Sequence, residues 1–157
     1  MDAYIYQSDL YCPTCANKRR LELDADYPSS LQGIEYDSDK YPQGPFPDGG
    51  GEADSFQYCA QCRVFLGNEL TVDGIQYEVE HLPDIEMLRM TSENITDAGP
   101  ESCWYDDEGE PLQPGYYYRY CTPGCLPDSD PYGPYPDYAI LCQHIIDENW
   151  PEEGATY

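Results

Sequence analysis

The chain has 157 residues, which is the length of one compact domain or of two small ones. Its 31 Asp and Glu residues against 7 Lys and Arg give a formal net charge of −24, and this charge repels nucleic-acid phosphates and anionic membranes. Tyrosine, at 17 residues, supplies much of the hydrophobic content, so the core would gain from a metal or disulfide staple.

Residues 1–11 lack the basic start and the apolar core of a signal peptide, and no apolar run approaches the length of a membrane span. We therefore expect no direct nucleic-acid binding, no membrane binding and a cytoplasmic location. In that compartment cysteines usually stay reduced and serve metal or redox chemistry.

The N-terminal half is predicted to combine strands with short helices. Alternating hydrophobicity predicts a strand over 3–12, and a short helix follows over 13–23. Residues 56–71 are typical of a strand, a turn and a second strand, and 74–82 favour a further strand. A proline followed by an acid in the first turn predicts a helix over 83–90.

The segment YPQGPFPDGGGEAD, residues 41–54, is unusually rich in Pro and Gly. A phosphate cradle prefers a nearby lysine, but none lies nearer than Lys40, and the segment ends on acidic residues. Prolines fix φ, and the aromatic residues between them can anchor the path. We interpret the segment as an ordered crossover whose glycines permit a bend before Cys59.

The C-terminal half begins with a predicted linker over 91–102, where turn-forming and polar residues dominate. A β-hairpin is predicted from strands over 103–107 and 116–121. The clearest helix covers 137–149, with Asp137 as its N-cap.

A loop predicted over 122–137 contains an internal echo. DSDPYGPYPD (128–137) resembles DSDKYPQGPFPD (37–48), with the same Gly-Pro-aromatic-Pro-Asp run. The flanking cysteine spacings differ, so recurrent turn chemistry explains the echo better than gene duplication.

Two C-x2-C units carry the strongest chemical signal of the sequence. Zinc prefers four tetrahedral ligands, and each tight C-x2-C turn supplies two thiolates, so the two units together predict a closed structural zinc site. Redox pairs or disulfides are the alternatives, although the βαβ context of thioredoxin-like redox pairs is not visible. The predicted ligands are Cys12, Cys15, Cys59 and Cys62.

A small basic cluster lies near the two units. It would help to offset the −2 charge of a zinc ion bound by four thiolates, which is a better use for it than nucleic-acid contact. Its members are Lys18, Arg19, Arg20 and Arg63.

The other four cysteines form a weaker pattern. A second zinc site is possible from Cys103, Cys121, Cys125 and Cys142. The competing interpretation is that Cys142, on the apolar face of a predicted helix, is a small buried hydrophobic residue. The two histidines, His81 and His144, belong to no catalytic motif, and we expect His81 to be a surface or capping residue rather than a ligand.

These patterns predict an α+β protein. Its zinc-ribbon-like antiparallel sheet module would cover residues 1–90, and its C-terminal β-hairpin and helix would form a module over 103–157, joined by the linker at 91–102. Structural zinc would be the cofactor, with one ion at the first cysteine set and a possible second at the other.

The sequence also resembles a known group. Residues 41–54, followed by CAQCRVFLGNELTVDGIQYEV (59–79), are similar to small uncharacterised bacteriophage and prophage proteins. Those proteins pair an early C-x2-C unit with a Tyr-Pro-x-Gly-Pro, Gly-Gly-Gly-Glu-Ala-Asp loop and a second C-x2-C unit before a VFL-N-LT strand. The resemblance covers about residues 3–80, and 104–137 resemble another recurrent phage segment. It implies zinc and a viral context, hence the host cytoplasm, but no established activity.

This chain departs from the group because Ala16 and Arg63 follow its C-x2-C turns where the group has Gly.

We expect a non-enzymatic phage accessory protein that binds another protein through its acidic surface. The alternative is a DNA mimic that inhibits a host nuclease or an anti-phage defence complex, because dense negative charge imitates phosphates. A zinc or redox enzyme is disfavoured, since four thiolates leave zinc no open position. The charge could instead be a plain solvated surface, or an adaptation to high salt in a chain whose only lysines are Lys18 and Lys40.

Overall fold

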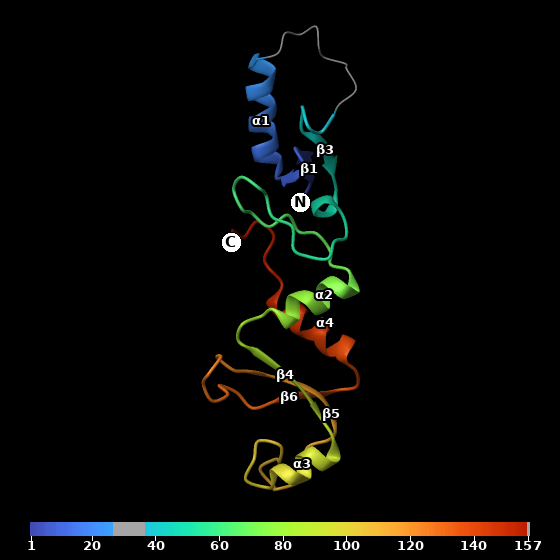
Figure 1. The fold of residues 1–157 in the computed structure, drawn as a ribbon, viewed down its shortest axis with the longest axis vertical. Helices are drawn as coiled ribbons and strands as arrows, with labels where there is room; N and C mark the ends of the chain where they lie inside the picture. The colour runs from blue at the N-terminus through green and yellow to red at the C-terminus, as the bar shows by residue number, and fades with distance from the viewer. Residues whose placement is uncertain (27–36, 157) are drawn as a thin grey trace. The chain divides into compact units, whose positions relative to one another are not determined.

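A computed structural model describes residues 1–26 and 37–156, and it combines helices with small antiparallel sheets (Figure 1). The predicted α+β class is therefore confirmed. The chain divides into two compact units: unit 1 comprises Met1–Gly74 and Trp150–Tyr157, and unit 2 comprises Ile75–Asn149. The division falls at Gly74 and Ile75 rather than in the segment 91–102 that we predicted as a linker.

Unit 1 contains a three-stranded antiparallel sheet in the order β2-β1-β3. Helix α1 follows β2 and packs against β1 and β2 (Figure 1). The elements are β1 (Ala3–Tyr6), β2 (Asp9–Tyr11), α1 (Pro13–Asp26), β3 (Gln43–Phe46) and the short 3-10 helix η2 (Asp48–Gly50). The predicted helix over 13–23 is thus confirmed.

The strand predicted over 3–12 is a tight hairpin. Gln7 and Ser8 form its two-residue turn, with positive φ of 52° and 66°, and Tyr6 pairs with Asp9 across it. Two positive φ values suit the right-handed twist of the adjoining strands. The prediction missed the turn because neither residue is the Gly or Asn that usually marks it.

The segment predicted as strand, turn and strand over 56–71 forms only isolated bridges, including Tyr58 with Phe65. The fully buried Asn68 holds this segment instead. Its side-chain oxygen accepts a hydrogen bond from the Gln57 backbone N–H at 2.7 Å, and its amide nitrogen donates to the carbonyl of Ser55 at 3.1 Å. The Asn68 side chain thus supplements the few backbone hydrogen bonds across this segment, such as that from the Leu66 N–H to the Gln57 carbonyl at 2.9 Å.

The segment after Asn149 completes unit 1. The Trp150 ring packs edge-on against Phe56, with centroids 5.1 Å apart, and the backbone of Thr156 bridges Val64. The N-terminal ammonium of Met1 pairs with Glu153. Unit 1 is therefore built from two separate stretches of the chain.

Unit 2 contains a second three-stranded antiparallel sheet, in the order β4-β5-β6. Tyr117 is fully buried beside Trp104 and Ile95, and α4 packs against β5 and β6. The elements are α2 (Val72–Glu80), which begins in unit 1, β4 (Ile85–Met90), α3 (Ser92–Ala98), β5 (Gly115–Tyr120), β6 (Tyr132–Tyr135) and α4 (Tyr138–Asn149).

Two neighbouring predictions in this region are wrong. Residues 74–82, predicted as a strand, lie mostly in α2, and 83–90, predicted as a helix, contain β4. Thr71 accepts a hydrogen bond from the Gly74 N–H at 2.9 Å, which satisfies one free donor at the start of α2. β4 forms six consecutive pairs with β5, and this pairing overrides the helix preference of Leu, Met and Glu.

The predicted linker contains helix α3, whose N-cap Thr91 accepts a hydrogen bond from the Asn94 N–H. The predicted 103–107 strand is absent among the described residues, where only the bridge between Tyr105 and Pro111 forms nearby. β5 pairs with β4 and β6 instead. The α4 prediction is confirmed, including the Asp137 cap, which accepts from the Ile140 N–H at 2.9 Å.

The internal echo occupies equivalent places in the two sheets. β3 and β6 both lie beside a central strand and both contain a cis Gly-Pro peptide, at Gly44 and Gly133. A Cβ added at Gly44 would lie 2.8 Å from the Tyr4 ring, and one at Gly133 would lie 2.6 Å from the Tyr117 ring. In both sheets the glycine lets an edge strand lie directly on an aromatic ring of the central strand.

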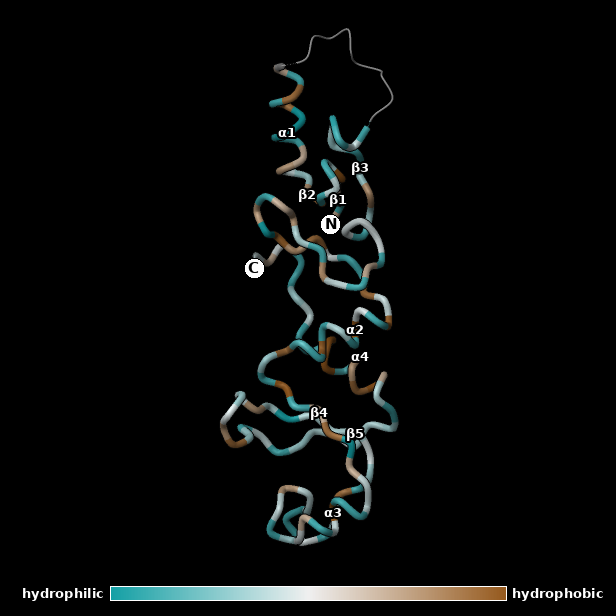
Figure 2. Tube along the Cα trace, viewed as in Figure 1, coloured by the Kyte–Doolittle hydropathy of each residue, from teal (hydrophilic) through white to brown (hydrophobic). Residues whose placement is uncertain are grey.

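Hydrophobic positions occur in short stretches along the trace (Figure 2). Among residues 1–26 and 37–156, no helix has the length and apolar character needed to cross a membrane.

Candidate metal centre

The first C-x2-C unit lies where β2 passes into α1. Cys12 follows the last residue of β2, and Pro13 and Cys15 lie in the first turn of the helix. The Ala16 N–H donates to the Cys12 carbonyl at 2.9 Å, so the thiols project from one helical turn. A helix continues from this unit, which explains why it needs no Gly after its second cysteine.

The second C-x2-C motif, Cys59 to Cys62, forms a hydrogen-bonded turn. The Arg63 N–H donates to the Cys59 carbonyl at 2.9 Å, and the Cys59 N–H donates to the Val64 carbonyl at 2.8 Å. Arg63 has φ of 63°, the left-handed conformation that favours Gly. Arg63 therefore forms this turn without the Gly that its conformation favours.

One backbone contact joins the two C-x2-C turns. The Ala60 N–H, inside the second turn, donates to the carbonyl of Leu10 in β2 at 2.8 Å. Because Leu10 lies two residues before Cys12, this bond places the second turn beside the first.

The four thiols form a compact cluster. Their sulfur atoms all lie within 4.8 Å of one another, and the Sγ atoms of Cys12 and Cys62 are 3.7 Å apart. Tetrahedral zinc with Zn–S bonds of about 2.3 Å places its sulfurs about 3.8 Å apart. The predicted set of Cys12, Cys15, Cys59 and Cys62 is therefore close enough to hold a metal ion.

Three of the four ligands lie inside the core of unit 1. Cys59, Cys12 and Cys15 are 0%, 5% and 8% exposed, whereas Cys62 is exposed. Ala3 and Leu66 complete the buried cluster, and Leu10, Tyr11, Met1 and Val64 pack around it. The site is a packed part of the interior with one ligand at the surface.

The thiols differ in acidity. Burial raises the pKa of Cys12 and of Cys15. Burial acts in the same direction on Cys59, but backbone hydrogen bonds from Cys12, Cys62 and Gln61 outweigh it and lower its pKa to about 7. Since metals bind thiolates, Cys59 is the ligand nearest to its binding form, and binding would release protons from Cys12 and Cys15.

Two members of the basic cluster have contacts of their own. Arg20 donates from Nε and Nη2 to the Pro42 carbonyl, at 3.2 and 2.8 Å, and its guanidinium lies 4.6 Å from the centre of the Tyr4 ring. Arg19 pairs with Glu22 at 3.0 Å. Arg20 therefore has a positioning role that the sequence did not indicate: it holds the start of the 41–54 segment against α1 and β1.

The 41–54 segment is ordered, as predicted. The Gly49 N–H donates to the Met1 carbonyl at 2.8 Å, and a Cβ at Gly49 would lie 2.6 Å from the Asn68 backbone nitrogen and 2.8 Å from the Leu66 carbonyl oxygen. Only glycine fits this approach. The segment thereby packs against the chain that follows the second C-x2-C turn.

The second predicted zinc site is not assembled. Among residues 1–26 and 37–156, the first cysteine set is the only group of three or more His, Cys, Asp or Glu ligand atoms that converge. Cys142 is 2% exposed in α4, and burial raises its pKa, as for a hydrophobic core residue. Cys103 and Cys125 are exposed, and Cys121 is half-buried.

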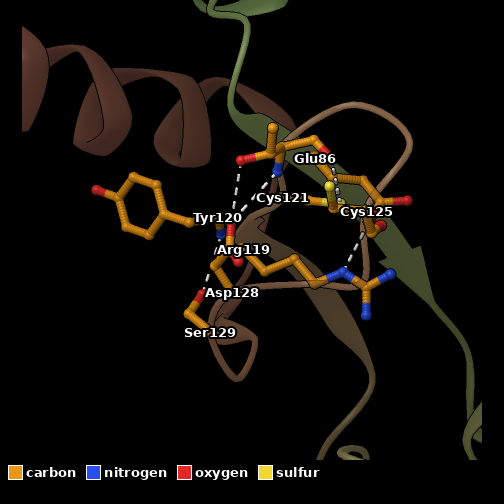
Figure 3. Close-up of polar contacts among 8 residues, drawn as sticks. Glu86, Arg119, Tyr120, Cys121, Cys125, Asp128 and Ser129 are labelled. Carbon is orange, nitrogen blue, oxygen red and sulfur yellow. Dashed lines mark hydrogen bonds and ion pairs between the residues drawn. The ribbon is translucent and has the colours of Figure 1, made fainter.

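Hydrogen bonds fix the loop around Cys121 and Cys125 (Figure 3). The Asp128 carboxylate accepts from the Thr122 hydroxyl at 3.1 Å, and the Ser129 hydroxyl accepts from the Tyr120 N–H at 3.0 Å. The Cys121 thiol lies 3.8 Å from the Cys125 carbonyl oxygen. This C-x3-C unit therefore has a structural explanation as a closed loop.

Neither histidine joins the thiol cluster as the structure describes it. The ring of His81 contacts the Tyr77 carbonyl through Nδ1 at 2.6 Å, near the end of α2, which confirms the expected capping role. His144 lies 3.4 Å from a Glu148 carboxylate oxygen on α4.

No family model matches the chain, and no curated protein or solved structure matches it either. The functional argument therefore depends on the geometry of the chain itself.

Proposed function

We propose that the chain is a non-enzymatic accessory protein in which zinc stabilises unit 1 and the acidic surface binds a basic protein. The observation that carries the zinc part is the convergence of four thiols within 4.8 Å, three of them buried. A set of four sulfur ligands suits tetrahedral zinc, and it leaves no coordination position for water or substrate. The metal would therefore be structural.

Charge supports the binding part. Unit 2 has only two Lys or Arg residues, Arg89 and Arg119. Arg119 donates to Glu86 at 2.7 Å, and the Arg89 guanidinium lies over the Tyr116 ring at 5.7 Å. The other carboxylates of unit 2 thus have little positive charge of their own unit nearby, and a basic partner would supply it.

The viral context of the proposal comes from the resemblance of residues 3–80 to phage proteins. A DNA mimic that inhibits a host nuclease or defence complex is the narrower alternative, favoured by the shortage of counter-charges in unit 2. The two versions share an acidic recognition surface and differ in the partner.

Metal analysis tests the zinc part directly. Protein purified under reducing conditions should contain one zinc per chain, and Cys15→Ser should contain none while Cys125→Ser keeps one. Removal of zinc with a chelator should abolish hydrogen-exchange protection in β1 and α1 but leave β5 and α4 protected. Metal-free wild-type protein with all cysteines oxidised would contradict the proposal.

Binding to a host extract at increasing salt tests the recognition part. A basic protein that dissociates as the salt concentration rises supports the proposal, since salt screens the attraction. Competition by duplex DNA would identify the mimic. Stability that rises with salt, with no basic partner bound, would instead indicate adaptation to a saline environment.

A further inference from the structure

One part of unit 2 combines aromatic rings with a carboxylate. The buried Tyr118, 2% exposed, lies at its centre on β5. We name the group the tyrosine face, and its members are Tyr118, Tyr120, Tyr132, Tyr135, His144 and Glu148.

The rings of the tyrosine face contact one another closely. Tyr132 stacks on Tyr118 with centroids 5.1 Å apart and an interplanar angle of 23°, and the Tyr120 ring meets Tyr132 edge-on at 6.1 Å. His144 lies 5.1 Å from Tyr135. Tyr132 is 47% exposed, so its outer surface is available to a partner.

A carboxylate lies within the tyrosine face. Glu148 accepts a hydrogen bond from the Tyr118 hydroxyl at 2.7 Å, yet its side chain remains 45% exposed. Burial and the charge of Glu148 both raise the pKa of Tyr118, Tyr120 and Tyr135. The group therefore combines exposed π-electron density with a negative charge, and both attract a cation.

Neither arginine of unit 2 provides a cation for the tyrosine face. Arg89 lies over Tyr116 and Arg119 pairs with Glu86, so neither of the two guanidinium groups of unit 2 contacts the rings of the tyrosine face in a cation–π arrangement. The imidazole of the face, His144, already faces Glu148, with Nε2 3.4 Å from a carboxylate oxygen.

We propose that the tyrosine face binds an arginine side chain of the basic protein partner, with the guanidinium stacked on Tyr132 and paired with Glu148. Arginine fits better than lysine because its planar guanidinium can stack on an aromatic ring and donate to a carboxylate at the same time. This inference rests on the proposed function and assigns it to a defined surface of unit 2.

Two short peptides of equal length and charge, tetra-arginine and tetra-lysine, test the proposal on the full zinc-loaded chain. The wild-type protein should bind tetra-arginine about 2- to 5-fold more tightly than tetra-lysine, the size of one exposed cation–π contact. Tyr132→Leu should abolish this preference, and Tyr132→Phe should keep it. Tyr77→Leu, which removes a 54% exposed tyrosine from α2 in the same unit, should also keep it.

The carboxylate is tested by a second matched pair. Glu148→Gln retains an acceptor for the Tyr118 hydroxyl but removes one charge, and Asp147→Asn removes one charge from the adjacent residue. Glu148→Gln should weaken tetra-arginine binding about 3-fold or more beyond the effect of Asp147→Asn. Circular dichroism checks that every variant folds.

The outcomes separate the inference from the proposed function. If both peptides bind equally, or if Tyr132→Leu behaves like Tyr77→Leu, the tyrosine face is not the binding surface, although acidic recognition stands. If neither peptide binds at low salt, acidic recognition fails and the inference fails with it.

Discussion

The chain contains two sets of four cysteines, and only the first set converges. Cys12 and Cys15 are fixed by a strand-to-helix turn, and a hydrogen bond from Ala60 to Leu10 brings Cys59 and Cys62 beside them. In the second set, Cys142 is buried in a helix, Cys121 and Cys125 share one loop, and Cys103 lies in another part of the chain. The comparison shows that backbone contacts between turns, rather than the number of cysteines, bring thiols close enough to hold a metal ion.

The cores of the two units also differ in the side chains that form them. In unit 1 three buried cysteines lie among Ala3 and Leu66, whereas in unit 2 the equivalent cluster consists of Ile95, Trp104 and Tyr117. Unit 1 also buries Phe65 against Phe56 and Trp150, but around its thiols small side chains bury less apolar area than the aromatic rings of unit 2 do. We therefore expect unit 1 to depend on metal and unit 2 to be independent of it.

Replacing a cysteine of each set tests this difference with the largest expected effect. Cys15→Ser should eliminate zinc binding and unfold unit 1, because structural zinc contributes about 10 kcal/mol or more in small zinc domains. Cys142→Ala should keep one zinc and cost only about 1 kcal/mol for the small cavity in unit 2. Zinc content and denaturant unfolding measure both effects; equal losses in the two variants would remove the distinction.

A glycine pair gives the next largest effect. Gly49→Ala should destabilise unit 1 by about 3 kcal/mol, since the new Cβ would strain a positive φ and collide with the backbone of Leu66 and Asn68. Gly109→Ala in unit 2 has a similar φ of 81° but no atom within 4 Å, so it should cost about 1 kcal/mol. Denaturant midpoints measure the difference, and equal midpoints would show that the crossover segment packs loosely.

Thiol labelling compares the two sets without mutation. In zinc-loaded protein, N-ethylmaleimide should modify the exposed Cys103 and Cys125 first and Cys121 more slowly, and buried Cys142 should resist. The first set should become reactive only after chelation, beginning with the exposed Cys62. Mass spectrometry of peptides follows each site; rapid labelling of Cys62 before chelation would contradict a bound metal.

The smallest expected effect concerns the second turn. Arg63→Gly should be more stable than Arg63→Ala by about 0.5–1 kcal/mol, because only glycine adopts φ of 63° without steric cost. Both variants remove the guanidinium, so their difference reports conformation rather than charge. Thermal unfolding of the zinc-loaded proteins measures it, and a more stable alanine variant would show that the turn relaxes.

Local signals allowed part of this structure to be predicted. The first cysteine set was predictable because each C-x2-C unit fits within one turn, and α4 because Asp137 caps a helix with a clear apolar face. In residues 74–90 a strand was predicted where the helix lies and a helix where the strand lies. The pairing of β4 with β5 and the cap at Thr71 outweigh the preferences of single residues there. Arg20 was expected only to offset zinc charge, and its positioning role was missed, since its Pro42 acceptor lies 22 positions away and no pattern links them.

Unit 2 is inserted into unit 1, because Trp150 and the residues after it return to contact Phe56 and Val64 of unit 1. During synthesis, the ribosome therefore releases all of unit 2 before it releases the strip of chain that covers Phe65. The thiols of unit 1 are therefore synthesised before Trp150 can pack on Phe65. We expect zinc to reach the four thiols more readily in this interval than in the completed chain.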